Sequence, residues 1–481
     1  MLFNSFSFGI FLLLVGTLYW TVFNRSRQRR NWFLLAASYF FYGCWDWRFL
    51  FLIMFITATD FVFGRLIHEK DEQKTRKWLL ASALIINLSV LGFFKYFNFF
   101  IESANSLLGL VGLGDSHLHT LNIILPVGIS FFTFQGLSYV IDIYRRQYEP
   151  TRDIVAFSTF IAFFPQLVAG PIERARDLLP QFLDPTKRKP FVYDDMRRGL
   201  VLIAVGLFKK VVIADRLAVY VDSVYASPTH GLPATIAVVF FCFQLYLDFS
   251  AYSQIAIGTA RLLGYRLSTN FLRPYLATNF KGFWSRWHIT LTSWFRDYLY
   301  IPLGGNRKGA TMTMVNTMIV FMVSGLWHGA SWNFVIWGAL NGLALIVIDR
   351  GLGLSKPPKL LPVKVLSAIF VTAYWAVTLI FFRAETFGDA LSMFGNLGFG
   401  NSEMLFSFGL NEAEFKFTCW IIVGLLAIEL LVENGKEKID NFFFNRFWPL
   451  RWICYLALVL GAIYLGIYGN GSDNNFIYFQ F

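Results

Sequence analysis

Two histidines lie in aromatic and apolar surroundings, where a polar side chain is energetically costly and usually has a function. His328 closes an apolar run and is followed by Gly329, and His288 lies between Trp287 and Ile289. A neutral imidazole can act as a general base, and burial favours the neutral form. We predict that His328 is a general base and that His288 is a second polar group facing the same cavity. The alternative is structural: a histidine bonded between helices or packed on aromatic rings.

A carboxylate and several side chains next to these motifs could support that chemistry. Asp248 lies inside a long apolar run, and carboxylates within a membrane are costly and usually face an interior cavity. It could orient a histidine, or pair with Arg286 or Arg296. We predict supporting roles for four residues: Asp248, Trp327, Ser324 and Tyr252.

The stretch between the two histidines is basic and aromatic. Arginine recognises phosphate groups through its planar guanidinium, so this stretch could hold an anionic donor. The candidate donor-binding residues are Arg286, Arg296, Asn306 and Arg307. The glycine-rich loop at 303–309 lacks the G-x-x-x-x-G-K-[ST] pattern of a phosphate-binding loop, so an ordinary loop before a helix is the alternative. The chain has no H-E-x-x-H motif and no C-x-x-C pair. Metal binding by the two histidines is a weak alternative without such spacing, and we predict no metal site. We also predict no bound cofactor.

The composition is that of a helical membrane protein. Hydrophobic residues make up 56% of the 481 residues and charged residues 15%, against about 25% charged in soluble domains. The alternating segments of a membrane barrel are absent. The net charge of +12 can be assigned to loops on one side of a bilayer, so nucleic acid is not an expected partner.

The hydropathy pattern predicts an all-α polytopic membrane protein with about 11–12 transmembrane helices plus re-entrant and interfacial helices. The expected spans are residues 6–23, 31–44, 49–67, 78–101, 121–143, 199–216, 234–263, 311–328, 332–348, 365–382, 415–432 and 452–468. Residues 154–172 contain Pro165, Gly170 and Pro171, which break a helix. We predict a re-entrant element there, with a kinked span as the alternative, and interfacial helices within 264–308.

The basic residues predict the orientation. If the N-terminus lies outside, the expected outside segments at 102–120, 217–231, 384–414 and 469–481 contain no lysine or arginine. Basic residues favour the cytoplasmic side, so His288 is expected on that side. We expect one integral-membrane domain over residues 1–481: N-terminal helices at 1–150, a catalytic core with both histidines at 151–350, and C-terminal helices at 351–481.

Four ordered motifs carry a resemblance to a known family. They are FPQLVAGPI at 164–172, LYLDFSAYS at 245–253, the run from WHITL through RDYLYIPLGGNR at 287–307, and GLWHGA at 325–330. The chain resembles the membrane-bound O-acyltransferases, in particular the bacterial branch that acts in alginate O-acetylation and teichoic-acid D-alanylation. The resemblance implies that His328 matches the essential intramembrane histidine of the family, and His288 the upstream histidine of the bacterial branch. It also implies a ring of tilted helices around a central tunnel, with a cytoplasmic funnel for the acyl donor.

The resemblance implies transfer of an acetyl group from a cytoplasmic thioester, acetyl-CoA, to a hydroxyl of an exported or cell-surface polysaccharide. The transfer would be direct or would use a periplasmic acyltransferase partner. The expected location is the bacterial cytoplasmic (inner) membrane, with several spans. One alternative is transfer of D-alanyl or another acyl group from a carrier-protein thioester. An alternative of another class is a membrane transporter or flippase, because intramembrane His and Asp also serve proton relays.

Overall fold

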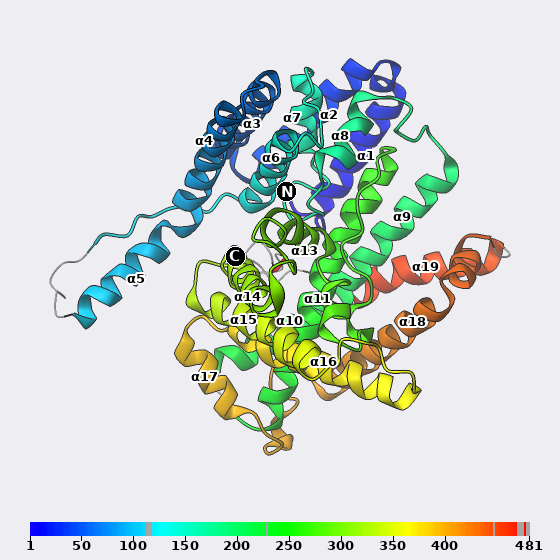
Figure 1. Ribbon diagram of the computed structural model, residues 1–481. Coiled ribbons are helices and arrows are strands. Elements are labelled where there is room, and N and C mark those ends of the chain that lie inside the picture. Colours follow the sequence, from blue (N-terminus) through cyan, green and yellow to red (C-terminus); the bar gives the residue numbers. More distant parts are fainter. Residues whose placement is uncertain (112–117, 228, 446–447, 469–475, 478–481) are drawn as a thin grey trace. The chain divides into compact units, whose positions relative to one another are not determined.

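The structure, a computed structural model, describes residues 1–111, 118–227, 229–445, 448–468 and 476–477, with the backbone alone at 436–443 and 445. Apart from an isolated β bridge between Gly231 and Leu397, the regular elements of these residues are helices (Figure 1). The chain divides into two compact units. The first contains residues 1–199, 256–268 and 329–331, and the second contains 200–255, 269–328 and 332–481.

The first unit is built from the N-terminal helices. They are α1 (Phe6–Thr21), α2 (Arg27–Asp46), α3 (Leu50–Glu69), α4 (Gln73–Leu91), α5 (Phe97–Leu110), α6 (Ile129–Tyr144), α7 (Ile154–Ala162) and α8 (Ala175–Leu183). Ser5 begins α1 by accepting a hydrogen bond from the backbone N–H of Phe8 at 3.2 Å, and Ser26 caps α2 in the same way. Serine oxygens satisfy the otherwise unpaired N–H groups of a first turn. Helices α3, α4 and α6 lie side by side (Figure 1).

The predicted break in residues 154–172 is confirmed. Helix α7 ends at Ala162 because Phe164 precedes Pro165, and a residue before proline disfavours the helical conformation. Residues 163–170 form turns, and every residue from 156 to 175 is buried. A Cβ atom at Gly170 would lie 2.4 Å from the Cα atom of Gln166, so this turn requires glycine. Irregular backbone is tolerated at membrane depth only when protein encloses it, and this segment is enclosed.

The second unit holds most of the remaining helices. They are α10 (Asp215–Ala226), α12 (Phe280–Trp284), α13 (Ile289–Phe295), α14 (Gly309–His328), α15 (Trp332–Leu343), α16 (Leu361–Arg383), α17 (Phe387–Asn396), α18 (Glu412–Asn445) and α19 (Trp448–Leu465). Helices α9 (Tyr193–Phe208) and α11 (Leu232–Leu262) continue from one unit into the other. The middle of α11 is buried on all sides, from Phe240 to Ser253, and forms much of the core of this unit.

The described residues contain eight helical segments that are long and apolar enough to cross a membrane. One of them, Arg27–Glu69, comprises both α2 and α3. The prediction of eleven or twelve spans also counted α1, α6 and residues 199–216. Helices α1 and α6 have 16 residues each, and a span needs about 20. Residues 199–216 belong to a continuous helical run from α9 into α10, but this stretch contains four charged residues: Lys209, Lys210, Asp215 and Arg216. Residues 264–308 fold into short helices, among them α12 and α13, as expected for a segment too polar to span. The protein is a multi-pass membrane protein.

Candidate active site

His328 is placed by a close approach of two helices in the second unit. It is the last residue of α14, and α15 follows after residues 329–331. A Cβ atom at Gly325 would lie 2.1 Å from the carbonyl oxygen of Phe334, and one at Gly338 would lie 2.2 Å from that of Phe321. Only glycine allows the two backbones to meet at this distance. The glycine pair therefore fixes the end of α14 that carries His328.

His288 is placed by a strained turn and by an asparagine. It lies directly before α13 with φ 42° and ψ 52°, a left-handed conformation that is uncommon outside glycine, although Asn, Asp and His are enriched in it. The backbone N–H of Ile289 donates to the carbonyl oxygen of Asn270 at 3.0 Å. The imidazole Nδ1 of His288 lies 3.2 Å from the side-chain oxygen of Asn270. These two bonds hold both the backbone and the ring.

The hydrogen bonds of Asn270 assign the tautomer of His288. The hydroxyl of Thr290 donates to the Asn270 side-chain oxygen at 2.9 Å, and the Thr290 N–H donates to it at 3.3 Å. An amide oxygen only accepts, so Nδ1 of His288 must carry the proton, and Nε2 keeps its lone pair. Asn270 was not singled out from the sequence, because it lies in none of the four motifs and meets His288 only in the folded chain.

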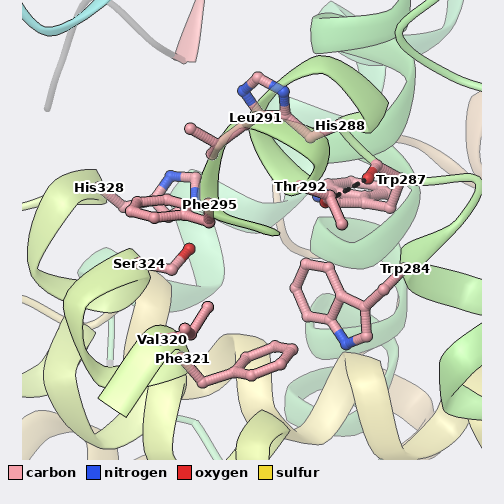
Figure 2. A pocket seen from close by; sticks show the side chains of 10 residues that line it. All are labelled: Trp284, Trp287, His288, Leu291, Thr292, Phe295, Val320, Phe321, Ser324 and His328. Carbon is pink, nitrogen blue, oxygen red and sulfur yellow. Dashed lines mark hydrogen bonds between the residues drawn. The ribbon is translucent and has the colours of Figure 1, made fainter. Parts of the chain in front are cut away.

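The two histidines face one pocket. The centroids of their rings lie 6.4 Å apart, and both line a cavity of about 60 Å³ together with Ser324 (Figure 2). The rest of the lining is mainly apolar and aromatic: Trp284, Trp287, Leu291, Thr292, Phe295, Val320 and Phe321. A water molecule needs about 10–15 Å³ measured in this way. The cavity therefore has room for about four heavy atoms, the size of an acetyl thioester group.

Aromatic rings surround both imidazoles and exclude water. The ring of His328 packs edge-on against Trp327 at 5.0 Å and Trp337 at 5.1 Å, and His288 packs against Phe249 at 4.8 Å. The exposed fractions are 1% for His288 and 5% for His328. Burial lowers the pKa of His288 to about 3, because desolvation disfavours the imidazolium. His288 is therefore neutral at physiological pH and suited to accept a hydrogen bond, but it is a weak base.

The structure brings only some of the predicted supporting residues to the histidines. Ser324 lines the pocket one turn before His328. Trp327 lies beside both imidazoles, with its ring 5.0 Å from that of His328 and 6.0 Å from that of His288. Tyr252 is not part of the pocket lining; its ring packs against Phe476 at 4.9 Å.

The expected partners of Asp248 were wrong. The carboxylate of Asp248 accepts from Nζ of Lys210 at 2.7 Å and from the backbone N–H of Ile477 at 2.8 Å. It does not pair with a histidine or with Arg286 or Arg296. Lys210 also contacts Asp215 at 2.8 Å and is 2% exposed. Buried charges need partners, and this cluster supplies them.

The predicted donor-binding residues lie outside the lining of the pocket. Arg286 donates to Glu433 at 2.8 Å, and Arg273 donates to the same carboxylate at 2.7 Å. Arg296 pairs with the adjacent Asp297 at 2.7 Å. Asn306 and Arg307 are exposed, and the Arg307 guanidinium makes a long 3.4 Å contact to the carbonyl oxygen of Ile301. Of the three arginines, Arg307 is therefore the one whose charge no carboxylate in the described residues neutralises.

Comparison with known proteins assigns this pocket to a family. Residues 150–387 match the family model "MBOAT, membrane-bound O-acyltransferase family", a range that includes both histidines. The chain is 39% identical to the probable alginate O-acetylase AlgI of Pseudomonas putida, over 84% of this chain and 80% of that protein. It is 35% identical to the peptidoglycan O-acetyltransferase of Helicobacter pylori, over 75% of this chain and 72% of that protein.

A more distant similarity is to a protein named for D-alanyl transfer. The chain is 25% identical to the teichoic acid D-alanyltransferase of Bacillus subtilis, over 50% of this chain and 63% of that protein. The matched motifs, the paired histidines in one pocket and the relatives agree with one another, and this chain is an acyltransferase that belongs to the membrane-bound O-acyltransferase family.

Proposed function

We propose that this protein transfers an acetyl group from acetyl-CoA on the cytoplasmic side of the bacterial inner membrane to a hydroxyl of an extracytoplasmic polysaccharide. The observation that carries the proposal is the pair of imidazoles, 6.4 Å between ring centroids, on one small cavity. The space among its lining residues suits an acetyl thioester. Relatives named for O-acetylation match more of the chain, at higher identity, than those named for D-alanylation.

His328 acts as the general base in the proposed reaction. The acceptor oxygen attacks the thioester carbonyl carbon while its proton passes to the imidazole of His328. The carbon–sulfur bond then breaks, and the proton passes from His328 to the leaving thiolate. The products are an O-acetyl ester and the CoA thiol, so protons balance over one turnover. General-base catalysis of this kind contributes roughly 10²–10⁴-fold.

His288 positions the reactants as a neutral ring. Its Nδ1–H is held by Asn270, so Nε2 can accept a hydrogen bond from the acceptor hydroxyl. The phosphates of acetyl-CoA contact the basic stretch that contains Arg286, Arg296 and Arg307, of which Arg307 is the most available. The polysaccharide receives the acetyl group directly or through a periplasmic acyltransferase partner.

Acetyl transfer by the purified protein tests the proposal. The assay uses [¹⁴C]acetyl-CoA with alginate and peptidoglycan oligosaccharides in nanodiscs and measures labelled ester. We expect His328→Ala to lower the rate at least 10²-fold, and His230→Ala, at an exposed histidine, to leave it unchanged. Transfer by His328→Ala at the wild-type rate would contradict the general-base role. Movement of label across the membrane without ester formation would indicate a transporter.

A further inference from the structure

A polar cluster is buried among apolar helices of the first unit and takes no part in the proposed chemistry. Its members come from three helices that pack together: Thr57 and Asp60 on α3, Asn87 on α4, and Thr133 on α6. Their exposed fractions are 2% or less. Helices α3 and α4 belong to candidate membrane spans. A carboxylate in such surroundings is expensive and calls for a functional explanation.

Close packing places Asn87 and the backbone of α6 against the carboxylate of Asp60. The amide nitrogen of Asn87 donates to Oδ1 of Asp60 at 2.8 Å. A Cβ atom at Gly136 would lie only 1.8 Å from Oδ2 of Asp60, so the carboxylate rests against the backbone of α6. One turn further along, a Cβ atom at Gly64 would lie 2.8 Å from the ring of Tyr139.

These two contacts fix the register of α3 and α6. Asp60 faces Gly136, and Gly64 faces Tyr139, so the two helices run in the same direction. Thr57 lies three residues before Asp60, and Thr133 lies three residues before Gly136. Residues three apart share a helix face, so both threonines lie about one turn before the carboxylate on the facing sides of α3 and α6.

Four oxygen atoms of this cluster are buried without a hydrogen-bond partner among the described residues. They are Oδ2 of Asp60, Oγ1 of Thr57, Oγ1 of Thr133 and Oδ1 of Asn87. No lysine or arginine of the described chain forms an ion pair with Asp60. Buried polar atoms normally have partners. A single positive group bound among these helices would give a partner to the carboxylate oxygen and to the three other oxygens of the cluster.

The chemistry of the oxygens selects the missing group. Carboxylate, amide and hydroxyl oxygens are hard ligands, which suit hard metal cations. One carboxylate neutralises a single positive charge, whereas a divalent cation would leave a net charge among apolar helices. We propose that Thr57, Asp60, Asn87 and Thr133 form a sodium site that links α3, α4 and α6. The close approach at Gly136 and Gly64 favours the smaller Na⁺ over K⁺.

Thermal unfolding of the full-length protein in detergent tests this site. Samples in NaCl, KCl and choline chloride at equal ionic strength are compared across 1–300 mM salt. We expect a saturable rise in Tm with Na⁺ alone, and direct binding of ²²Na⁺ with the same half-saturation. An equal Tm in all three salts, with no bound ²²Na⁺, would overturn the proposal and indicate a protonated carboxyl group instead.

Variants assign the site to these residues. Asp60→Asn removes the charge and should abolish both the Na⁺ response and ²²Na⁺ binding. Asp71→Asn is the matched control, because the Asp71 side chain is fully exposed, and it should keep both. If Asp60→Asn does not fold, Thr133→Val keeps the shape of the side chain and should raise the half-saturating Na⁺ concentration about tenfold. Wild-type Na⁺ binding by Thr133→Val and Asp60→Asn would place the ion elsewhere. The result does not depend on the acetyl-transfer reaction.

Discussion

Gly325→Ala tests whether the contact between α14 and α15 positions His328. The new Cβ atom would lie 2.1 Å from the carbonyl oxygen of Phe334, whereas ordinary contacts begin at 3.4 Å. The two helices must therefore separate by about 1 Å. Overpacking of this kind costs about 1–3 kcal/mol, and misplacing a reacting group by about 1 Å can lower a rate about 10²-fold.

Two measurements separate the effect on stability from the effect on catalysis. Thermal unfolding should show a lowered Tm for Gly325→Ala, and the acetyl-transfer assay should show a reduced kcat at a temperature where the variant is fully folded. Gly424→Ala is the matched control, because no heavy atom lies within 4 Å of a Cβ at that position of α18. Gly338→Ala should resemble Gly325→Ala, and the double variant should be less than additive because both open the same gap. Equal kcat values for Gly325→Ala and Gly424→Ala would refute the reasoning.

Three further results are expected. His288→Asn should make the protein less sensitive to acid: burial lowers the pKa of His288 to about 3, so its stabilising contribution is complete above an unfolded-state pKa of about 6.5. The contribution of His288 to the free energy of unfolding falls by about 2 kcal/mol at pH 5. Parallel curves of Tm against pH for the wild type and His288→Asn would exclude this effect of His288. Lys210→Met should cost about 3–5 kcal/mol by leaving Asp248 and Asp215 unpaired, whereas Lys416→Met, which breaks an exposed i,i+4 pair, should cost about 0.3–0.5 kcal/mol in the same unfolding assay. Arg307→Ala should raise the KM for acetyl-CoA about tenfold with little change in kcat, and an unchanged KM would remove Arg307 from the donor site.

The parts of the site that the sequence could predict are those that local patterns encode. The apolar runs predicted most of the helices, and Pro165 predicted where α7 ends. His288 and His328 were expected to face one cavity because each is a polar ring in aromatic and apolar surroundings, and they do so. These predictions depend on residues close in sequence, for which propensity and spacing carry the information.

The parts that could not be predicted depend on contacts between distant residues. Asn270 holds the ring of His288, but an asparagine in an aromatic and basic stretch gives no sign of its partner. Asp248 was matched with the wrong cations because Lys210 lies on another helix and the N–H of Ile477 comes from residues far along the chain. The glycines at 325 and 338 meet only once α14 and α15 are packed.

The contact between Lys210 and Asp215 depends on a local change in helix pitch. Residues Lys209–Ala214 form a π turn, in which hydrogen bonds span five residues where an α-helix spans four. The two charged residues are five positions apart, and the wider turn brings them to the same side. Deleting one residue between them would replace the π turn by the α-helical repeat, in which residues four apart share a side, so α10 would keep its orientation. Among related sequences, a one-residue difference in length here is therefore compatible with the same packing of α10, and an alignment that omits this gap would pair residues that lie about 100° apart around the helix.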